Sequence, residues 1–428
     1  MTHTLDQQLK ELGSSDLITG TREKNSLNQL LPDFLRSARS HLGMEVAFIA
    51  EFNDGNRVFR HVDSSVEDQR VKVGGSDPLE QTYCQRVVDG RLPELIPDTA
   101  AVPAALELSV TKALPVGAHL SVPIKLKDGS VYGTFCCFSF TPDLSLNQRD
   151  LSMMRVFADL AGEAIQRDAE ASKQHEEKVR RVRSVIKDDG LSMVYQPIIN
   201  VEQNELVGFE SLTRFSATPL RGPDVWFSEA ASVGLGWELE MRAVKLATAA
   251  LHYLPADVYL SFNVSPETLA NGALQRSLEG LPLERLVLEI TEHASVAQYS
   301  EILEALTPLT KRGLRIAVDD AGAGYASFRH ILQLQPDIIK LDMSLTRDID
   351  TDGAKRALAS ALILFAKETG SKIVAEGVET VSELKALRSL GVKEVQGYLL
   401  GRPGPLSQAL ALCSPVCRYS PVPAEMFS

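Results

Sequence analysis

The feature that most constrains the fold is a regular alternation of strand-like and helix-like segments from residue 190 onward. Eight short apolar runs occur there, and helical patterns separate them from the second run on: LSMVYQPII, ELVGFESLTRF, VYLSFNVS, LVLEITE, LRIAVDD, DIIKLD, KIVAEGVE and EVQGYLL. Strand–helix alternation over roughly 220 residues is typical of a (β/α)8 barrel. The sequence therefore predicts an α/β fold with a TIM-like barrel.

One connection departs from the barrel pattern. Only NVEQN, residues 200–204, joins the first run to the second. A parallel pair of strands needs a crossover of about a dozen residues or more, usually a helix. We therefore expect the first strand to run antiparallel to the second.

Polar residues follow the apolar part of seven of the eight runs. They are Glu210, Asn263, Glu289, Asp319 with Asp320, Lys340, Glu376 and Gln396. In TIM barrels the C-terminal ends of the strands form the face where catalytic groups converge. A single glutamate at a strand end is usually a solvated surface residue, but five acidic groups in one barrel mouth repel one another unless cations are present. Oxygen ligands of this kind suit Mg²⁺ or Mn²⁺, and adjacent aspartates can serve two ions about 3.5–4 Å apart.

Other chemistries find no support in the sequence. It contains no GxSxG elbow, Walker loop or HExxH motif, and its histidines show no metal-ligand spacing. The net charge of −12 disfavours binding to DNA or RNA polymers. The five cysteines, without a CxxC pair, indicate reduced thiols. The polar N-terminus and the absence of a long apolar run predict a cytoplasmic protein that does not insert into membranes.

The N-terminal half predicts a smaller α+β domain. Two strand-like runs, HLSVPIKL and VYGTFCCFSF, flank the turn KDGS, which is a strong hairpin signal. An amphipathic helix, DLSLNQRDLSMMRVFADLAGEAI, closes this half. We expect this domain to span residues 22–168.

A charged segment joins the two halves. Residues 166–189 contain no Gly or Pro and predict one solvated helix. The thin apolar stripe on it fits either a plain connector or a short parallel coiled coil in a homodimer, and the residues leave both open: Ile165, Ala169, Ser172, Val179, Val182 and Ile186. The predicted order is a linker over 169–187, a barrel over 188–412 and a loose tail over 413–428.

The second half resembles the EAL-domain family, phosphodiesterases that linearise cyclic di-GMP. The resemblance rests on motifs spread over the barrel: YQPI at 195–198, Glu210-Ser211-Leu212, NVSP at 263–266, LEITE at 288–292, DDAGAGY at 319–325, IKLD at 339–342, AEGVE at 375–379 and QGYLLGRP at 396–403. It implies metal-dependent hydrolysis of cyclic di-GMP to linear pGpG with two Mg²⁺ or Mn²⁺ ions.

The resemblance also implies roles for single residues. The metal ligands are expected to be Glu210, Asn263, Glu289, Asp319 and Asp320. Lys340 resembles the group that orients or deprotonates the attacking water, Gln396 lies near that water, and Glu376 supports an ion through bound water. The substrate contacts are expected to be Gln196, Leu212 and Arg214, with Arg214 facing a phosphate. Glu292 and Glu379 resemble residues that hold the DDAGAGY loop in place.

Three residues depart from the family pattern. Ser211 stands in place of the signature alanine, Ala321 in place of a usual phenylalanine and Ala323 in place of a usual threonine. The two alanines remove a bulky anchor and a hydroxyl from the aspartate loop. No metal ligand is lost.

The first half resembles a GAF domain, a regulatory fold with an antiparallel sheet and flanking helices. The match rests on SVPIKLKDGSVYGTFCCFSF and the helix at 150–165, and leaves the ligand of the domain unknown. Cys84, in TYCQRV, could attach a bilin, but we expect a buried structural cysteine.

Two functions follow. The first is a hydrolase whose rate the GAF-like half controls through the linker. The second is a receptor that binds cyclic di-GMP without cutting it. Degenerate receptors of this family usually lose a metal carboxylate or the lysine, and because this chain retains all of these residues, the sequence favours the hydrolase.

Overall fold

The protein consists of two compact units, and the boundary between them lies inside one long helix. The structure, a computed structural model, describes residues 20–66, 71–188, 190–290, 299–322 and 327–414. The first unit extends from Met1 to Gln174 and the second from His175 to Ser428. Their boundary falls inside helix α6, Gln148–Lys187, which is continuous over 40 residues. The charged segment predicted as one helix is therefore helical through Lys187.

The first unit is built on a six-stranded antiparallel sheet in the order β3-β2-β1-β6-β5-β4. Its strands are β1 Val46–Asn53, β2 Asn56–Ser64, β3 Ser76–Pro78, β4 Leu95–Ile96, β5 Ala118–Lys125 and β6 Val131–Ser139. The hairpin predicted around KDGS is confirmed, because β5 pairs antiparallel with β6 across that turn.

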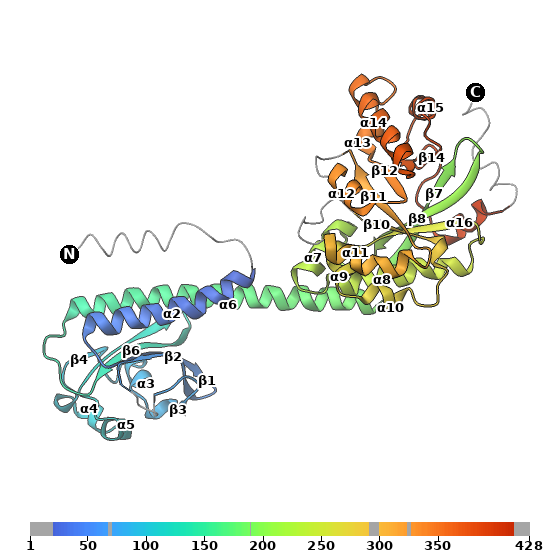
Figure 1. The fold of residues 1–428 in the computed structure, drawn as a ribbon. Helices are drawn as coiled ribbons and strands as arrows, with labels where there is room; N and C mark the ends of the chain where they lie inside the picture. The colour runs from blue at the N-terminus through green and yellow to red at the C-terminus, as the bar shows by residue number, and fades with distance from the viewer. Residues whose placement is uncertain (1–19, 67–70, 189, 291–298, 323–326, 415–428) are drawn as a thin grey trace. The chain divides into compact units, whose positions relative to one another are not determined.

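Helices cover both faces of this sheet (Figure 1). One face packs against α2, Gly20–Leu42, and the first half of α6, where the rings of Phe34 and Phe157 lie 5.6 Å apart. The other face packs against α3, Tyr83–Val88, α4, Pro103–Leu106, and α5, Ser109–Ala113. Neighbouring residues of β6 therefore enter different apolar cores, Cys136 on the α3 side and Cys137 on the α6 side.

The second unit is a closed eight-stranded barrel in the order β10-β11-β12-β13-β14-β7-β8-β9. Its strands are β7 Leu191–Asn200, β8 Glu205–Phe215, β9 Tyr259–Asn263, β10 Leu286–Ile290, β11 Arg315–Ala321, β12 Ile338–Leu341, β13 Lys372–Ala375 and β14 Glu394–Val395. The predicted barrel is confirmed. β7 runs antiparallel to both of its neighbours, β8 and β14, as the short first connection requires.

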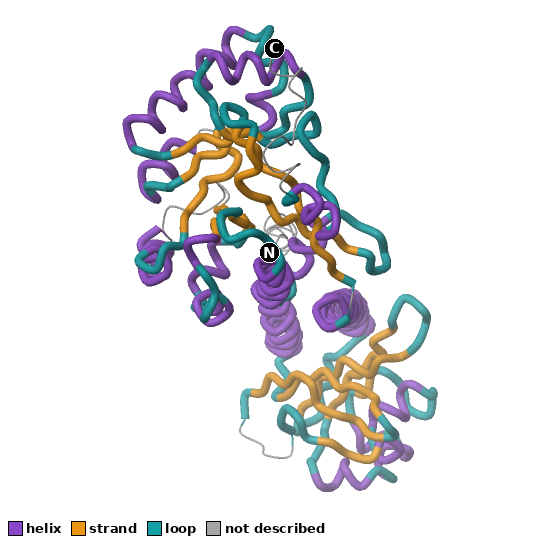
Figure 2. Tube along the Cα trace, turned by 90° about the vertical axis from the view of Figure 1, so that its right-hand side faces the viewer, coloured by secondary structure: helices purple, strands orange, loops and turns teal. Residues whose placement is uncertain are grey.

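Helices lie around the barrel strands (Figure 2). They are α7 Pro223–Ser232, α8 Gly236–Thr248, α9 Pro266–Ala270, α10 Ala273–Ser277, α11 Tyr299–Thr310, α12 Ser327–Leu334, α13 Met343–Thr346, α14 Gly353–Thr369, α15 Val381–Ser389 and α16 Leu406–Leu412. A continuous apolar core fills the space between strands and helices.

Two strands are shorter than the sequence suggests. The predicted runs 372–379 and 394–400 form strands only over Lys372–Ala375 and Glu394–Val395. Gly377 has φ +64°, which an extended strand cannot accommodate, and a Cβ added at Gly397 would lie 2.1 Å from the carbonyl oxygen of Val378. The two segments cross closely where they leave the barrel, so neither continues as a strand.

The apolar stripe of α6 serves packing within each unit. Ile165 packs in the core of the first unit, whereas Val182 is fully buried against the second, with Val179 and Ile186 beside it. Ala169 is exposed and Ser172 is partly exposed. The stripe that suggested a coiled coil is thus used mainly within the chain, and a homodimer stays a prediction.

Candidate metal centre

The alternation of side chains along the strands places the polar residues in the barrel interior. An apolar layer inside the barrel includes Val287, Ala317, Ile338 and Val374. Residues two positions apart on a strand face the same side. The next inward positions on β10, β11 and β12, and the position after β13, are occupied by Glu289, Asp319, Lys340 and Glu376. Inside the barrel, the layer of polar side chains therefore lies next to the layer of apolar side chains, on the side of the C-terminal strand ends.

Lys340, on β12, lies at the centre of four carboxylates. Its Nζ is 2.6 Å from Glu376, 2.7 Å from Glu289, 3.1 Å from Asp319 and 3.5 Å from Glu210. Only 2% of the residue is exposed to solvent. Five of the predicted side chains thus converge on one point.

Three amide side chains complete this layer. Gln396, which follows β14, donates from Nε2 to Glu210 at 2.6 Å and to Gln196 of β7 at 2.9 Å. Asn263, at the end of β9, donates to Glu289 at 3.2 Å and to Glu210 at 3.4 Å. The structure therefore gathers side chains from all eight strands or their ends.

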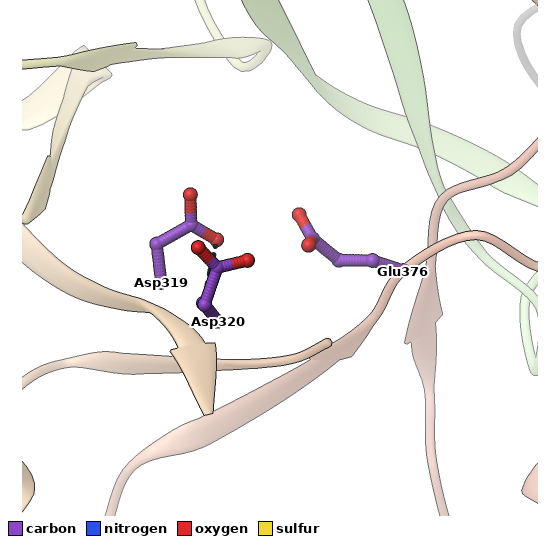
Figure 3. A group of neighbouring side chains, drawn as sticks. All are labelled: Asp319, Asp320 and Glu376. Carbon is purple, nitrogen blue, oxygen red and sulfur yellow. Dashed lines mark hydrogen bonds between the residues drawn. The ribbon is translucent and has the colours of Figure 1, made fainter. Parts of the chain in front are cut away.

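The two aspartates face Glu376 across the barrel mouth. Carboxylate oxygens of Asp319, Asp320 and Glu376 lie within 4.8 Å of one another, and Figure 3 shows the three groups converging. Asp320 adopts a left-handed conformation with φ +57°, and its amide donates to Asp319 at 3.0 Å. This conformation is uncommon for a residue with a Cβ, and such strain gathers at functional sites.

The crowded carboxylates perturb one another's ionisation. Burial and the charge of Glu210 raise the pKa of Glu289 to about 8, although Lys340 opposes this. Burial and the charge of Asp319 raise the pKa of Asp320 to about 6. Burial alone would lower the pKa of Lys340, but the surrounding carboxylates raise it well above its ordinary value. The site holds more negative charge than one ammonium can balance.

The donor set fits divalent cations of the Mg²⁺ and Mn²⁺ class. All the side chains around the excess charge offer carboxylate or amide oxygens, which these ions prefer. The Oε1 atom of Gln396 is buried and has no hydrogen-bond partner among the described residues, so a polar group at the centre would satisfy it. The residues that could hold the ions are Glu210, Asn263, Glu289, Asp319, Asp320 and Glu376.

A pocket of about 200 Å³ opens beside the cluster. Its lining includes Asn263, Leu212 and Arg214 of β8, and Phe227 of α7. Arg214 is exposed, and its Nη1 donates to the carbonyl oxygen of Thr213. The predicted substrate residues Leu212 and Arg214 therefore share a cavity with a predicted metal ligand.

The departures from the family pattern have separate outcomes. Ser211 is buried and donates to the carbonyl oxygen of Ser261 at 2.7 Å, so its hydroxyl is satisfied. Ala321 is fully buried in the barrel core. Ala323 and Glu292 lie outside the described residues. Glu379 is exposed and pairs with Arg347 at 3.2 Å, so its role at the aspartate loop stays a prediction.

Two acidic residues near the site were missed by sequence reasoning. Asp342 directly follows β12, and its side chain bonds that of Asp320 and caps α13 by accepting from Ser344. The signal was available, because Asp342 also stands at a strand end. Glu240 lies on α8 and offers no such signal.

Glu240 supports the loop that carries Asn263. Its Oε2 accepts hydrogen bonds from the amide and the hydroxyl of Ser265, both at 3.0 Å. Ser265 in turn caps α9 by accepting from Thr268. Glu240 also lines the pocket beside Asn263. Its carboxylate therefore fixes the backbone two residues after a metal-ligand candidate.

Family models match both halves of the chain. The EAL domain model matches residues 179–403, and the GAF domain model matches residues 26–165. The cyclic di-GMP phosphodiesterase NbdA of Pseudomonas aeruginosa is 31% identical over 53% of this chain and 30% of its own length. The probable cyclic di-GMP phosphodiesterase PdeD of Escherichia coli is 30% identical over 49% of this chain and 41% of its own length.

Longer alignments cover both units. An uncharacterized signaling protein of Caulobacter vibrioides is 26% identical over 94% of this chain and 52% of its own length. The chain thus spans between 30% and 52% of the length of these three relatives.

Among solved structures, the PaMucR phosphodiesterase in complex with c-di-GMP is 28% identical over 54% of this chain and 99% of that one, with a TM-score of 0.50. The EAL enzyme Bd1971, with cAMP and cyclic di-GMP bound, shares the fold over 87% of this chain and 93% of that one, at 17% identity and a TM-score of 0.52.

Proposed function

Because this chain belongs to the EAL domain family, we propose that it hydrolyses cyclic di-GMP to linear pGpG with Mg²⁺ or Mn²⁺ as cofactor. The observation that carries the proposal is the complete set of carboxylates around Lys340. No ligand position predicted from the family pattern has been replaced. The relatives named as cyclic di-GMP phosphodiesterases support the choice of substrate.

Bound ions would neutralise charge on a phosphodiester and lower the pKa of a bound water. Lys340, held as an ammonium by its carboxylate neighbours, would donate a hydrogen bond that orients the attacking water. Glu376, 2.6 Å from Lys340, would accept a proton from that water. Gln396, whose Oε1 has no hydrogen-bond partner among the described residues, would contact the same water. These groups together would favour in-line attack and departure of the 3′ oxygen.

The substrate would lie across the barrel mouth. Arg214 is exposed beside the pocket and can pair with a phosphate in the geometry that guanidinium groups favour. The 200 Å³ pocket is smaller than the roughly 300–1,000 Å³ of typical small-molecule sites, so it would accept one part of the dinucleotide. Gln196, bonded to Gln396 and to the carbonyl oxygen of Gly401, would contact the substrate from β7.

We also propose that the GAF-like half controls the rate through α6. Arg181, near the end of α6, donates to Glu229 of α7 at 2.7 Å, and Glu229 also pairs with Arg221. The Glu229 side chain is only 8% exposed. Because α7 also supplies Phe227 to the pocket wall, a shift of α6 would move that wall. Every residue of this route lies within the described part of the chain.

The protein would act in the cytoplasm as a homodimer. Within the described part of the chain, every helix is too short or too polar to cross a membrane.

The proposed hydrolysis is tested by incubating the full chain with cyclic di-GMP and Mg²⁺ or Mn²⁺ and separating the nucleotides by chromatography. Appearance of pGpG supports it. Tight binding of cyclic di-GMP without any product would instead favour the receptor function.

A further inference from the structure

A second buried polar cluster lies in the first unit, between the sheet and α3. It joins Arg57 of β2 and Cys136 of β6 to Cys84 at the start of α3, with Ser121 of β5 and Thr134 of β6 beside them. Cys84, Cys136, Ser121 and Thr134 are fully buried, and Arg57 is 5% exposed. Neither the metal centre nor the proposed hydrolysis uses this cluster.

The two thiols of the cluster are in direct contact. Sγ of Cys84 lies 3.7 Å from Sγ of Cys136, although 52 residues separate them in sequence. A disulfide requires about 2.05 Å between the sulfurs, so small side-chain rotations and a slight approach of α3 to the sheet would close the bond. Cys136 is further oriented by Ser121 at 3.1 Å and Thr134 at 3.2 Å.

A buried cation lies next to Cys84. Nη1 of Arg57 is 3.6 Å from the Cys84 sulfur, and the guanidinium lies 4.4 Å from the centre of the Phe59 ring. Burial opposes ionisation of Cys84, but the hydrogen bond from Cys136 and the charge of Arg57 lower the pKa of its thiol to about 6. Thiolates beside cations are the cysteines that react with oxidants.

The adjacent cysteine shows the contrast. Cys137 faces the other side of the sheet, where its sulfur lies 3.8 Å from the sulfur of Met154. Burial raises the pKa of its thiol far above the ordinary value. Cys137 therefore offers a control on the same strand with the same burial. The contact given for its sulfur is the thioether of Met154, in place of the guanidinium and thiol beside Cys84.

We propose that Cys84 and Cys136 form a redox-sensitive dithiol that a hydroperoxide converts into an intramolecular disulfide. The Cys84 thiolate attacks the peroxide and the O–O bond breaks. The departing oxygen takes up the proton that the Cys84 thiol had released, so an alcohol or water leaves and Cys84 becomes a sulfenic acid. The Cys136 sulfur then attacks the Cys84 sulfur, the S–OH bond breaks, and the departing hydroxide takes the Cys136 thiol proton and leaves as water. The two thiols lose two electrons, which reduce the peroxide.

Because both thiols are buried, the oxidant can reach them only when the first unit opens locally. α3 has six residues and lies among short helices and turns, the kind of layer that opens locally without global unfolding. Closure of the disulfide removes the thiolate beside Arg57, which keeps its ion pair with Asp77, and ties α3 to β6. The disulfide would then make the first unit respond to oxidants without a bound ligand.

The test is disulfide mapping on the full, folded chain. The reduced protein is exposed to hydrogen peroxide, blocked with an alkylating agent and digested without reduction, and the peptides are identified by mass spectrometry. A peptide linking Cys84 to Cys136 is expected in the unaltered chain and in Cys137→Ser. In Cys136→Ser, a dimedone adduct is expected on Cys84 in place of the disulfide.

Two results would overturn the proposal. One is the absence of the 84–136 peptide while Cys413, which is partly exposed, becomes oxidised. The other is a linked peptide that forms only in denaturant. Both can be read from the unaltered chain, so the test stands even if a serine variant fails to fold.

Discussion

Replacing Lys340 by methionine should lower the free energy of unfolding of the metal-free barrel, and the burial of the Lys340 ammonium determines by how much. The ammonium lies within 3.5 Å of four carboxylates and is almost fully buried. Removing one partner of a buried ion pair costs about 3–5 kcal/mol, because the remaining charge stays buried. At about 2–4 °C per kcal/mol for a domain of roughly 150–250 residues, the melting temperature of the barrel should fall by about 6–20 °C.

The assay is calorimetry of the full chain in EDTA and then in Mn²⁺. A matched control is Lys393→Met, because Lys393 pairs with Glu202 at 2.8 Å while both side chains are more than 60% exposed. Such a surface pair contributes less than about 1 kcal/mol. Manganese at about 100 times its dissociation constant should stabilise the wild-type protein by about 2.7 kcal/mol. Manganese should stabilise the Lys340→Met variant by more than it stabilises the wild type, because no ammonium competes with the ion for the carboxylates. An EDTA melting temperature for Lys340→Met that matches the control would refute the central role given to this charge.

Three further predictions concern the surroundings of the site. Glu240→Ala should weaken Mn²⁺ binding about 10–100-fold by freeing the loop of Asn263, whereas Glu240→Gln should bind nearly normally; equal losses in a metal titration would exclude a positioning role. Ca²⁺ should support cyclic di-GMP binding but little turnover, because it coordinates more loosely and acidifies water less; full activity in Ca²⁺ alone would argue against the metal mechanism. Glu229→Gln should change kcat of the full chain severalfold through α7 while Mn²⁺ affinity holds, and Glu301→Gln, an exposed change on α11, should alter neither; a kcat equal to wild type would exclude this route.

The barrel and most of its site could be predicted from the sequence because both follow from the order of the strand-like runs and the polar residues that end them. Strand–helix alternation indicated the fold, and the positions of Glu289, Asp319 and Lys340 at the ends of strand-like runs predicted that they meet at the C-terminal face of the barrel. The short connection at 200–204 was enough to predict the antiparallel first strand. These features depend on local patterns that the chain displays directly.

Other features depend on contacts between distant segments. The early ends of β13 and β14 result from a close crossing at Gly377 and Gly397, which no local pattern encodes. Glu240 resembles any polar helix residue until α8 is packed against Ser265. The pairing of Cys84 with Cys136 depends on how α3 lies on the sheet. Such sites emerge only from tertiary packing.

The most direct test of the central claim is the turnover of cyclic di-GMP by Glu210→Ala compared with Glu205→Ala. Both residues lie on β8, but Glu210 is buried beside Lys340 and Gln396, whereas Glu205 stands at the other end of the strand. With Mn²⁺ present, Glu205→Ala should form pGpG at close to the wild-type rate. Glu210→Ala should remain folded and form almost none. Product formation by folded Glu210→Ala at the wild-type rate would contradict the assignment of this cluster as the catalytic metal centre.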